Sequence, residues 1–165
     1  MSGETEKIRP HSALPGKRQV VIVQIIKAAG ARFARGRHHK KTNDCLLGIA
    51  TGKSQRGVRA ILTHHDLLPH FTTIKTADDA PSKPHPGMIL EAMREAGAEP
   101  HDTIMIGDTS YDMEMARAAG VHAIGVNWGY HPHDRLEQSG AAEIVSDFAE
   151  LGRRIETLML ARAPA

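Results

Sequence analysis

The sequence predicts a three-layer, Rossmann-like α/β fold with helices on both faces of a parallel sheet. Short apolar runs alternate with amphipathic segments from Cys45 onward, and this alternation is typical of strand and helix units in a parallel sheet. A length of 165 residues, 41% of them hydrophobic, suits a domain with a core of its own. In this architecture ligands bind beyond the carboxyl ends of the strands, so the residues at those ends are the first candidates for a site.

The first strand and helix unit covers residues 45–65. The run CLLGIAT (45–51) is apolar and ends in a turn, which indicates a buried strand. Residues 54–65 place apolar side chains at helical spacing and begin with Ser54, whose hydroxyl suits an N-cap. We therefore expect a strand followed by a helix.

The second unit follows in the same order. FTTIKTA (71–77) alternates as a strand does, and the prolines of PSKPHP (81–86) exclude regular structure there. Residues 87–96 have a helical pattern that ends at Gly97, because glycine readily closes a helix in the left-handed conformation.

The remainder of the chain repeats this alternation. Gly120 ends one of its helices. The loop NWGYHPH then leads into a short helix, and the capping box Asp147-x-x-Glu150 marks the start of the last helix. The strands expected here are 103–107, 122–126 and 143–146, and the first helix is 112–119.

Charge divides the chain near Cys45. Residues 1–44 carry ten Lys or Arg against three acids (+7), and residues 45–165 carry eleven against sixteen (−5). We expect residues 1–44 to form a basic N-terminal segment that is separate from the core. The core is expected to cover 45–165. The basic stretch 31–41 suits binding to nucleic acid or to an acidic surface, but a solvated or disordered connector is the favoured interpretation, because no aromatic residue beyond Phe33 offers a platform for stacking. A nucleic-acid partner is therefore not expected.

Cysteine usage and hydropathy bear on the compartment. Cys45 is the single cysteine, which excludes an internal disulfide framework and favours a reducing compartment, so a cytoplasmic protein is expected. The longest apolar run is far shorter than the ~20 residues that span a bilayer, so no membrane partner is expected.

Three successive strand ends carry groups suited to a phosphate ester. Thr51 and Gly52 offer a hydroxyl and backbone N–H groups at a helix start, and Lys83 offers a cation between prolines. Asp108 follows the third strand, and Asp112 lies one helical turn further on. Carboxylate oxygens close to groups that can donate hydrogen bonds to a phosphate suggest a hard divalent cation such as Mg²⁺. Taken singly, each residue also has a structural explanation, and Asp112 is equally well explained as the N-cap of its helix.

These segments resemble motifs two, three and four of the haloacid dehalogenase superfamily, nearest to its phosphoglycolate phosphatase-like hydrolases. The matching stretches occur in the family order, over residues 45 to about 150, and read LLGIATGKS (46–54), DDAPSKPHPGMILEAM (78–93) and IMIGDTSYDMEMARAAGVHAIGVNWGY (104–130). The resemblance implies a Mg²⁺-dependent phosphomonoesterase for a small phosphorylated metabolite, in which an aspartate attacks phosphorus.

The resemblance also implies roles for the residues at the strand ends. Thr51 and Lys83 would be catalytic residues that grip the phosphoryl group, with Gly52 beside them. Asp108 would bind the metal, and Asp112 would join it or orient the site through Lys83 or a metal-bound water.

One family motif is absent. Members begin with an apolar strand that ends in Asp-x-Asp-Gly-Thr, which supplies the nucleophile, but the acids before motif two are Glu4, Glu6 and Asp44, and none ends such a strand. In its place, residues 14–29 resemble the family helix that leads into motif two, followed by an irregular insertion over 31–44, although Val20 to Val23 also fits a strand. We therefore expect a truncated or frame-shifted member, incomplete at the N-terminus and lacking the central strand and the helical cap. Such a chain would be weak or inactive alone, and its unpaired strand edges would favour self-association.

Alternatives from other classes remain open. A non-catalytic phosphate-binding or interaction module would keep Thr51, Lys83 and Asp108 and use them to hold a ligand. A P-loop is less favoured, because its first glycine would stand at position 47, which is Leu47. The histidines at 64, 65, 70, 131 and 133 fit no strong zinc spacing. The loop that begins at Trp128 is a candidate for substrate contact or for covering the sheet edge.

Overall fold

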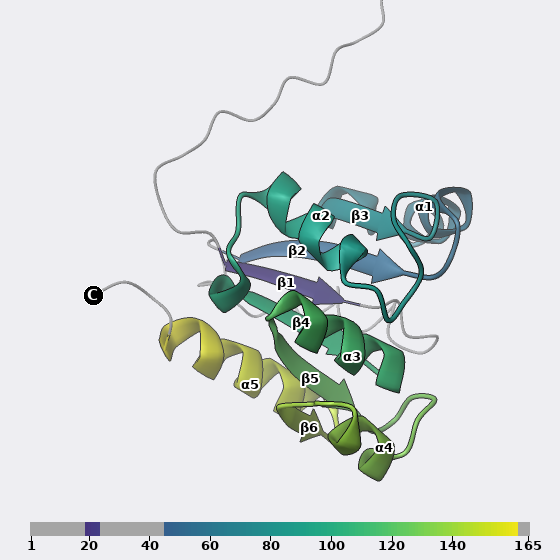
Figure 1. The fold of residues 1–165 in the computed structure, drawn as a ribbon. Helices are drawn as coiled ribbons and strands as arrows, with labels where there is room; N and C mark the ends of the chain where they lie inside the picture. Colours follow the sequence, from purple (N-terminus) through teal and green to yellow (C-terminus); the bar gives the residue numbers. More distant parts are fainter. Residues whose placement is uncertain (1–18, 24–44, 162–165) are drawn as a thin grey trace, which may run out of the picture.

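The computed structural model describes residues 19–23 and 45–161 of the chain. Within these ranges it contains a six-stranded parallel sheet in the order β3-β2-β1-β4-β5-β6 (Figure 1). The strands are β1 (Gln19–Val23), β2 (Cys45–Thr51), β3 (Phe71–Thr76), β4 (Thr103–Gly107), β5 (His122–Val126) and β6 (Glu143–Val145). The helices are α1 (Gln55–His64), α2 (Gly87–Ala96), α3 (Ser110–Ala119), α4 (His133–Gln138) and α5 (Phe148–Ala161), with 3₁₀ turns at Leu68–His70 and Pro100–Asp102. The predicted α/β class is confirmed.

Strand β1 corrects the expectation for the N-terminal segment. It lies between β2 and β4 and pairs with both, with Val20 opposite Leu46 on one side and Thr103 on the other. The helix predicted over 14–29 is therefore wrong at 19–23, where the alternative of a strand holds. The rest of that helix and the insertion 31–44 lie outside the described residues.

The reason for this correction is physical. Val20 to Val23 are all β-branched, which favours the extended backbone, and β2 and β4 each present N–H and C=O groups that a central strand satisfies. The expected gap between β2 and β4 is filled, so the sheet is not missing its central strand. The unpaired edges on which self-association was based are absent at this position.

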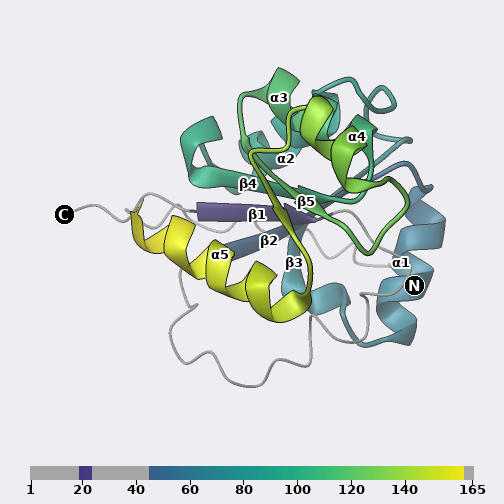
Figure 2. The ribbon, with the colours of Figure 1, turned by 90° about the horizontal axis from the view of Figure 1, so that it is seen from below.

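Helices cover both faces of the sheet, as Figure 2 shows in a view from below. Alternate residues of the strands point to opposite layers: Met105 of β4 packs with α2 and α3, whereas its neighbours Ile104 and Ile106 pack in the cluster that contains Leu151 of α5. On the same face as α5, Ile49 of β2 packs with Val58 and Leu62 of α1. The first cluster forms the part of the core under α2 and α3, and the other two form the part under α5 and α1 on the opposite face.

Most helix ends lie where the capping residues of the sequence predicted them. Ser54 caps α1 by accepting a hydrogen bond from the N–H of Gly57, and Gly97 closes α2 at φ 67°. At the start of α5, Asp147 accepts from the Glu150 N–H, while the Glu150 carboxylate accepts from the N–H of Ser146 instead of that of Asp147. Helix α3 begins at Ser110, two residues before the predicted start.

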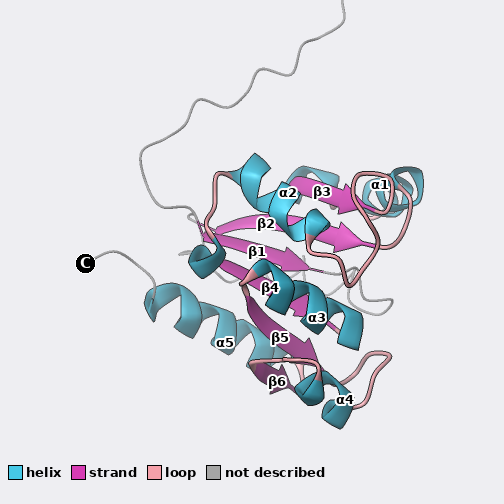
Figure 3. Cartoon of the chain, in the orientation of Figure 1, coloured by secondary structure: helices cyan, strands magenta, loops and turns pink. Residues whose placement is uncertain are grey.

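The loops at the carboxyl ends of the strands gather along one edge of the sheet, where the arrowheads point in Figure 3. This edge carries the predicted site residues. None of the helices in 45–161 is long and apolar enough to cross a membrane.

Candidate phosphate and metal site

The sheet register places Thr51 and Asp108 at the same level, with the strand β1 between them. Ile49 of β2 and Ile106 of β4 both pair with Val23 of the intervening β1. Thr51, the last residue of β2, and Asp108, the first residue after β4, each lie two residues further along the chain, and both side chains are almost fully buried. Two of the predicted residues therefore flank the end of the central strand.

Thr51 ends β2 as predicted and leads into the start of α1. Its hydroxyl oxygen accepts a hydrogen bond from the N–H of Lys53, which shapes the turn before the helix. Gly52 lies in this turn and is exposed, and a side chain there would meet no atom within 4 Å. The turn therefore leaves open space at the start of α1.

Lys83 reaches from the β3 to α2 loop to helix α3. Its ammonium nitrogen lies 2.5 Å from Oδ1 of Asp112, in an ion pair whose lysine side chain is 10% exposed and whose carboxylate is fully buried. The two residues are 29 positions apart in sequence, so the fold brings motif three and motif four into direct contact.

Asp112 holds the start of α3 as well as Lys83. Its Oδ2 accepts from the N–H (3.0 Å) and the hydroxyl (2.8 Å) of Thr109, while the Thr109 hydroxyl accepts from the Asp112 N–H. The N-cap is therefore Thr109, and the reading of Asp112 as N-cap is wrong: it is the third helical residue of a capping box. With hydrogen bonds on both oxygens, Asp112 is suited to orienting Lys83.

Gly107 makes room for this carboxylate. A Cβ at position 107 would lie 2.3 Å from Cβ of Asp112, closer than any real contact allows. The glycine at the end of β4 is therefore needed for close packing of α3, which the sequence motif alone did not explain.

Asp108 is 1% exposed and is held by the loop after β5. Its Oδ2 accepts from the N–H of Tyr130 at 3.1 Å. Burial raises the pKa of Asp108, and the charge of Asp112 adds to this rise, whereas the Tyr130 N–H and the Lys83 ammonium lower it in part. The net pKa lies above the usual value of an aspartate, chiefly because the carboxyl group is buried.

We did not predict from the sequence that residues 129–131 hold Asp108 in place. Gly129 packs so tightly that a Cβ there would lie 2.1 Å from Cβ of Asp108, and the N–H of His131 donates to the Asp108 carbonyl. The glycine in NWGYHPH was the available signal, because a glycine in a loop beside a strand end often marks a close approach of the backbone.

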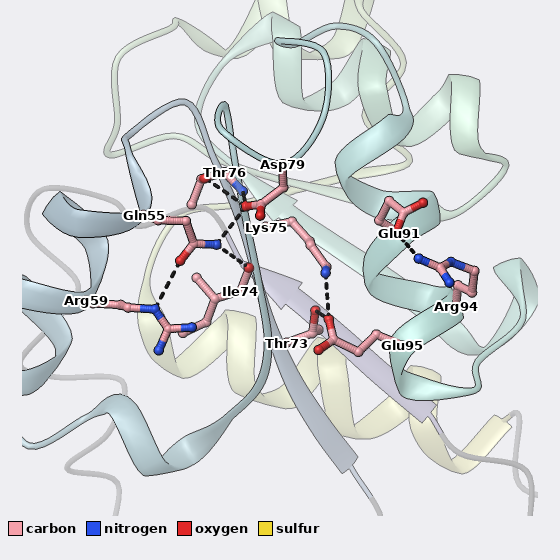
Figure 4. Close-up of polar contacts among 10 residues, drawn as sticks. All are labelled: Gln55, Arg59, Thr73, Ile74, Lys75, Thr76, Asp79, Glu91, Arg94 and Glu95. Carbon is pink, nitrogen blue, oxygen red and sulfur yellow. Dashed lines mark hydrogen bonds and ion pairs between the residues drawn. The ribbon is translucent and has the colours of Figure 1, made fainter. Parts of the chain in front are cut away.

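A second polar cluster anchors the loop that carries Lys83 (Figure 4). Asp79 accepts hydrogen bonds from the N–H and hydroxyl of Thr76 and from the side-chain amide of Gln55, and that amide also donates to the carbonyl of Ile74. Burial raises the pKa of Asp79, but the hydrogen bonds from Gln55 and Thr76 outweigh it and leave the pKa below its usual value. The loop therefore starts at a fixed position beside α1.

The described residues contain no group of three or more His, Cys, Asp or Glu side chains that could hold a metal ion. His64 and His65 contact each other through their rings, and Nδ1 of His131 accepts a hydrogen bond from the Ser110 N–H.

Comparison with known proteins adds an independent line of evidence. The family model described as haloacid dehalogenase-like hydrolase matches residues 39–126. A curated protein of Dickeya dadantii, named "Probable phosphatase IndB", is 40% identical over 120 residues, which cover 72% of this chain and 52% of that protein. "Phosphoglycolate phosphatase 1" of Pseudomonas aeruginosa is 34% identical over 108 residues, covering 65% and 39%.

Solved structures agree with the sequence matches. A conserved haloacid dehalogenase-like protein of unknown function from Agrobacterium tumefaciens superposes with a TM-score of 0.65 at 27% identity, covering 82% of this chain and 61% of that one. The chain spans about half the length, or less, of the curated relatives it matches.

Proposed function

Because the chain belongs to the family of haloacid dehalogenase-like hydrolases, we propose that its core binds a small phosphorylated metabolite and Mg²⁺ as phosphoglycolate phosphatases do. The observation that carries this proposal is the shared edge of the sheet, where buried Asp108 and Thr51 lie on either side of the end of β1 and Asp108 is influenced by the Lys83–Asp112 pair. An anion placed there would meet a hydroxyl, an ammonium group and a helix start.

Thr51 and Lys83 are assigned to the phosphoryl group. The Thr51 hydroxyl and the backbone of Gly52 lie where α1 begins, so the positive end of the helix dipole supports an anion. Lys83 is held by Asp112 and by the anchored loop, which reduces the conformational entropy that the lysine would lose on binding.

Asp108 fits Mg²⁺ as its protein ligand. Mg²⁺ is commonly held by one or two carboxylates, with waters and substrate phosphate completing the coordination, so the lack of a larger carboxylate group among the described residues is compatible with it. A divalent cation would also offset the cost of burying the Asp108 charge, which the raised pKa expresses. When bound, Mg²⁺ would neutralise negative charge on the phosphate.

Turnover is proposed to be weak or absent in this chain. The central strand is present, but the residues that follow Val23 are Gln24 and Ile25, and the single acid between Val23 and β2 is Asp44, directly before β2. The family nucleophile follows the strand in this position, so the sequence offers no aspartate to attack phosphorus. This observation favours a protein that holds phosphate over one that hydrolyses its ester.

A steady-state assay of the purified 165-residue chain with phosphoglycolate and Mg²⁺ tests this proposal. We expect phosphate release at the level of an Asp108→Ala control. Mg²⁺-dependent turnover that the control lacks would contradict the loss of catalysis and identify an active phosphatase.

A further inference from the structure

The loop after β5 holds Asp108 through three consecutive residues. Gly129 packs against its Cβ, the Tyr130 N–H donates to its carboxylate at 3.1 Å, and the His131 N–H donates to its carbonyl at 3.0 Å. The orientation of the Asp108 carboxylate therefore depends on where this loop lies.

The side chain of His131 links the same loop to helix α3. Its Nδ1 accepts a hydrogen bond of 2.8 Å from the N–H of Ser110, the first residue of the helix. That N–H has no acceptor within the helix, because the first turn of an α-helix leaves its N–H groups without helical partners. The His131 ring also contacts the ring of Tyr111, with centroids 5.9 Å apart.

We propose that His131 is a positioning residue for Asp108. The imidazole fixes the loop to the start of α3, and this connection keeps the Tyr130 N–H aligned with the Asp108 carboxylate. The significance for Mg²⁺ rests on the proposed function, whereas the effect on Tyr130 does not. Groups that orient a metal ligand from outside the coordination shell typically change metal affinity about 10- to 100-fold when removed.

The proposal has a signature that needs no variant. A ring nitrogen that accepts a hydrogen bond carries no hydrogen, so neutral His131 must carry its hydrogen on Nε2. The ¹⁵N shifts of the His131 ring at about pH 8 should show this tautomer. A hydrogen on Nδ1 in the neutral ring would overturn the proposal.

Two variants test whether the hydrogen-bond acceptor of His131 or only the volume of its side chain matters. His131→Leu keeps an apolar side chain without an acceptor, and His131→Asn retains an acceptor near the place of Nδ1. His133→Leu is the matched control, because the His133 side chain is 56% exposed and lies beside Asp134. Amide hydrogen exchange of Tyr130 and calorimetric titration with Mg²⁺ are measured on each full-length chain.

We expect His131→Leu to speed exchange of the Tyr130 amide about tenfold and to weaken Mg²⁺ binding about tenfold, with recovery in His131→Asn. The control should change neither. Unchanged exchange in His131→Leu, or faster exchange without loss of Mg²⁺ affinity, would reduce His131 to a helix cap and overturn the proposal. If the wild-type chain does not bind Mg²⁺, the proposed function fails, and the Tyr130 exchange rates with their rescue by asparagine still decide the positioning.

Discussion

Lys83 and Asp112 form an ion pair with 2.5 Å between Nζ and Oδ1, and the carboxylate has no exposed surface. This contact joins the loop after β3 to the first turn of α3, so it has a structural effect in addition to its proposed part in phosphate binding. The loss of either partner leaves a buried charge without its counter-ion.

We predict that Lys83→Met destabilises the fold by about 3 kcal/mol, because Asp112 then remains buried and keeps Thr109 as a partner without the cation. Urea denaturation measures the change in the free energy of unfolding. Lys53→Met is the control, because Lys53 is exposed, and it should change stability by less than about 0.5 kcal/mol. Equal effects of the two substitutions would contradict a structural role of the pair.

Gly107→Ala is expected to displace Asp112 and with it the Lys83 ammonium. The new Cβ would lie 2.3 Å from Cβ of Asp112, and overpacking of this kind typically costs about 1–3 kcal/mol. Gly52→Ala serves as the comparison, since nothing lies within 4 Å of a Cβ there. Thermal unfolding of both variants checks this prediction, which fails if Gly107→Ala unfolds at the wild-type temperature.

The raised pKa of Asp108 predicts a pH-dependent cost. In the folded state this carboxyl binds its proton up to a higher pH than in the unfolded chain, so folding stability falls as pH rises from the ordinary aspartate range through the folded pKa. Asp108→Asn should therefore stabilise the chain at neutral pH and lose this advantage at pH below about 4. Unfolding free energies at several pH values measure the difference, and a stabilisation independent of pH would contradict the assignment.

Glu143 provides the opposite case at the amino ends of β5 and β6. The hydrogen bond from Arg154 lowers the pKa of Glu143 despite partial burial, and His122 contributes in the same direction. Its stabilisation is present above the unfolded pKa and is lost as pH falls through the folded one. We expect Glu143→Gln to lower the melting temperature at pH 7 and to have little effect at about pH 3. A loss of equal size at both pH values would mean that the charge is not responsible.

Much of the architecture was predictable because local signals and tertiary packing agree. The helix 87–96 with its Gly97 stop and the strand 103–107 were predicted with their observed bounds, since helical periodicity, a glycine terminator and an apolar run point to one structure at each place. The N-terminal region was different. There, resemblance favoured a helix over 14–29, whereas the strand at 19–23 depends on pairing with β2 and β4, which are distant in sequence.

The site residues were identified from strand ends. The family resemblance offered Lys83 as one of two partners for Asp112, and their ion pair agrees with that alternative, but the other contacts of the site were not predicted. Nothing in the spacing of Lys83 and Asp112 specifies an ion pair across 29 residues, because contact depends on how the β3 to α2 loop crosses the sheet edge. The backbone donors from Tyr130 and His131 were equally hidden, since any residue type carries an N–H. Thr109 was available as a cap from its position before α3, and its capping box with Asp112 explains why the helix starts earlier than predicted.

The central claim is that the chain retains a Mg²⁺-assisted phosphate grip. A ³¹P NMR titration of the 165-residue chain with inorganic phosphate, in the presence and absence of Mg²⁺, tests it most directly. We predict saturable binding that is strengthened by Mg²⁺, loses this Mg²⁺ dependence in Asp108→Asn and is abolished in Lys83→Met chains that remain folded. Phosphate signals unaffected by the wild-type chain, or binding that survives both substitutions with its Mg²⁺ dependence intact, would contradict it.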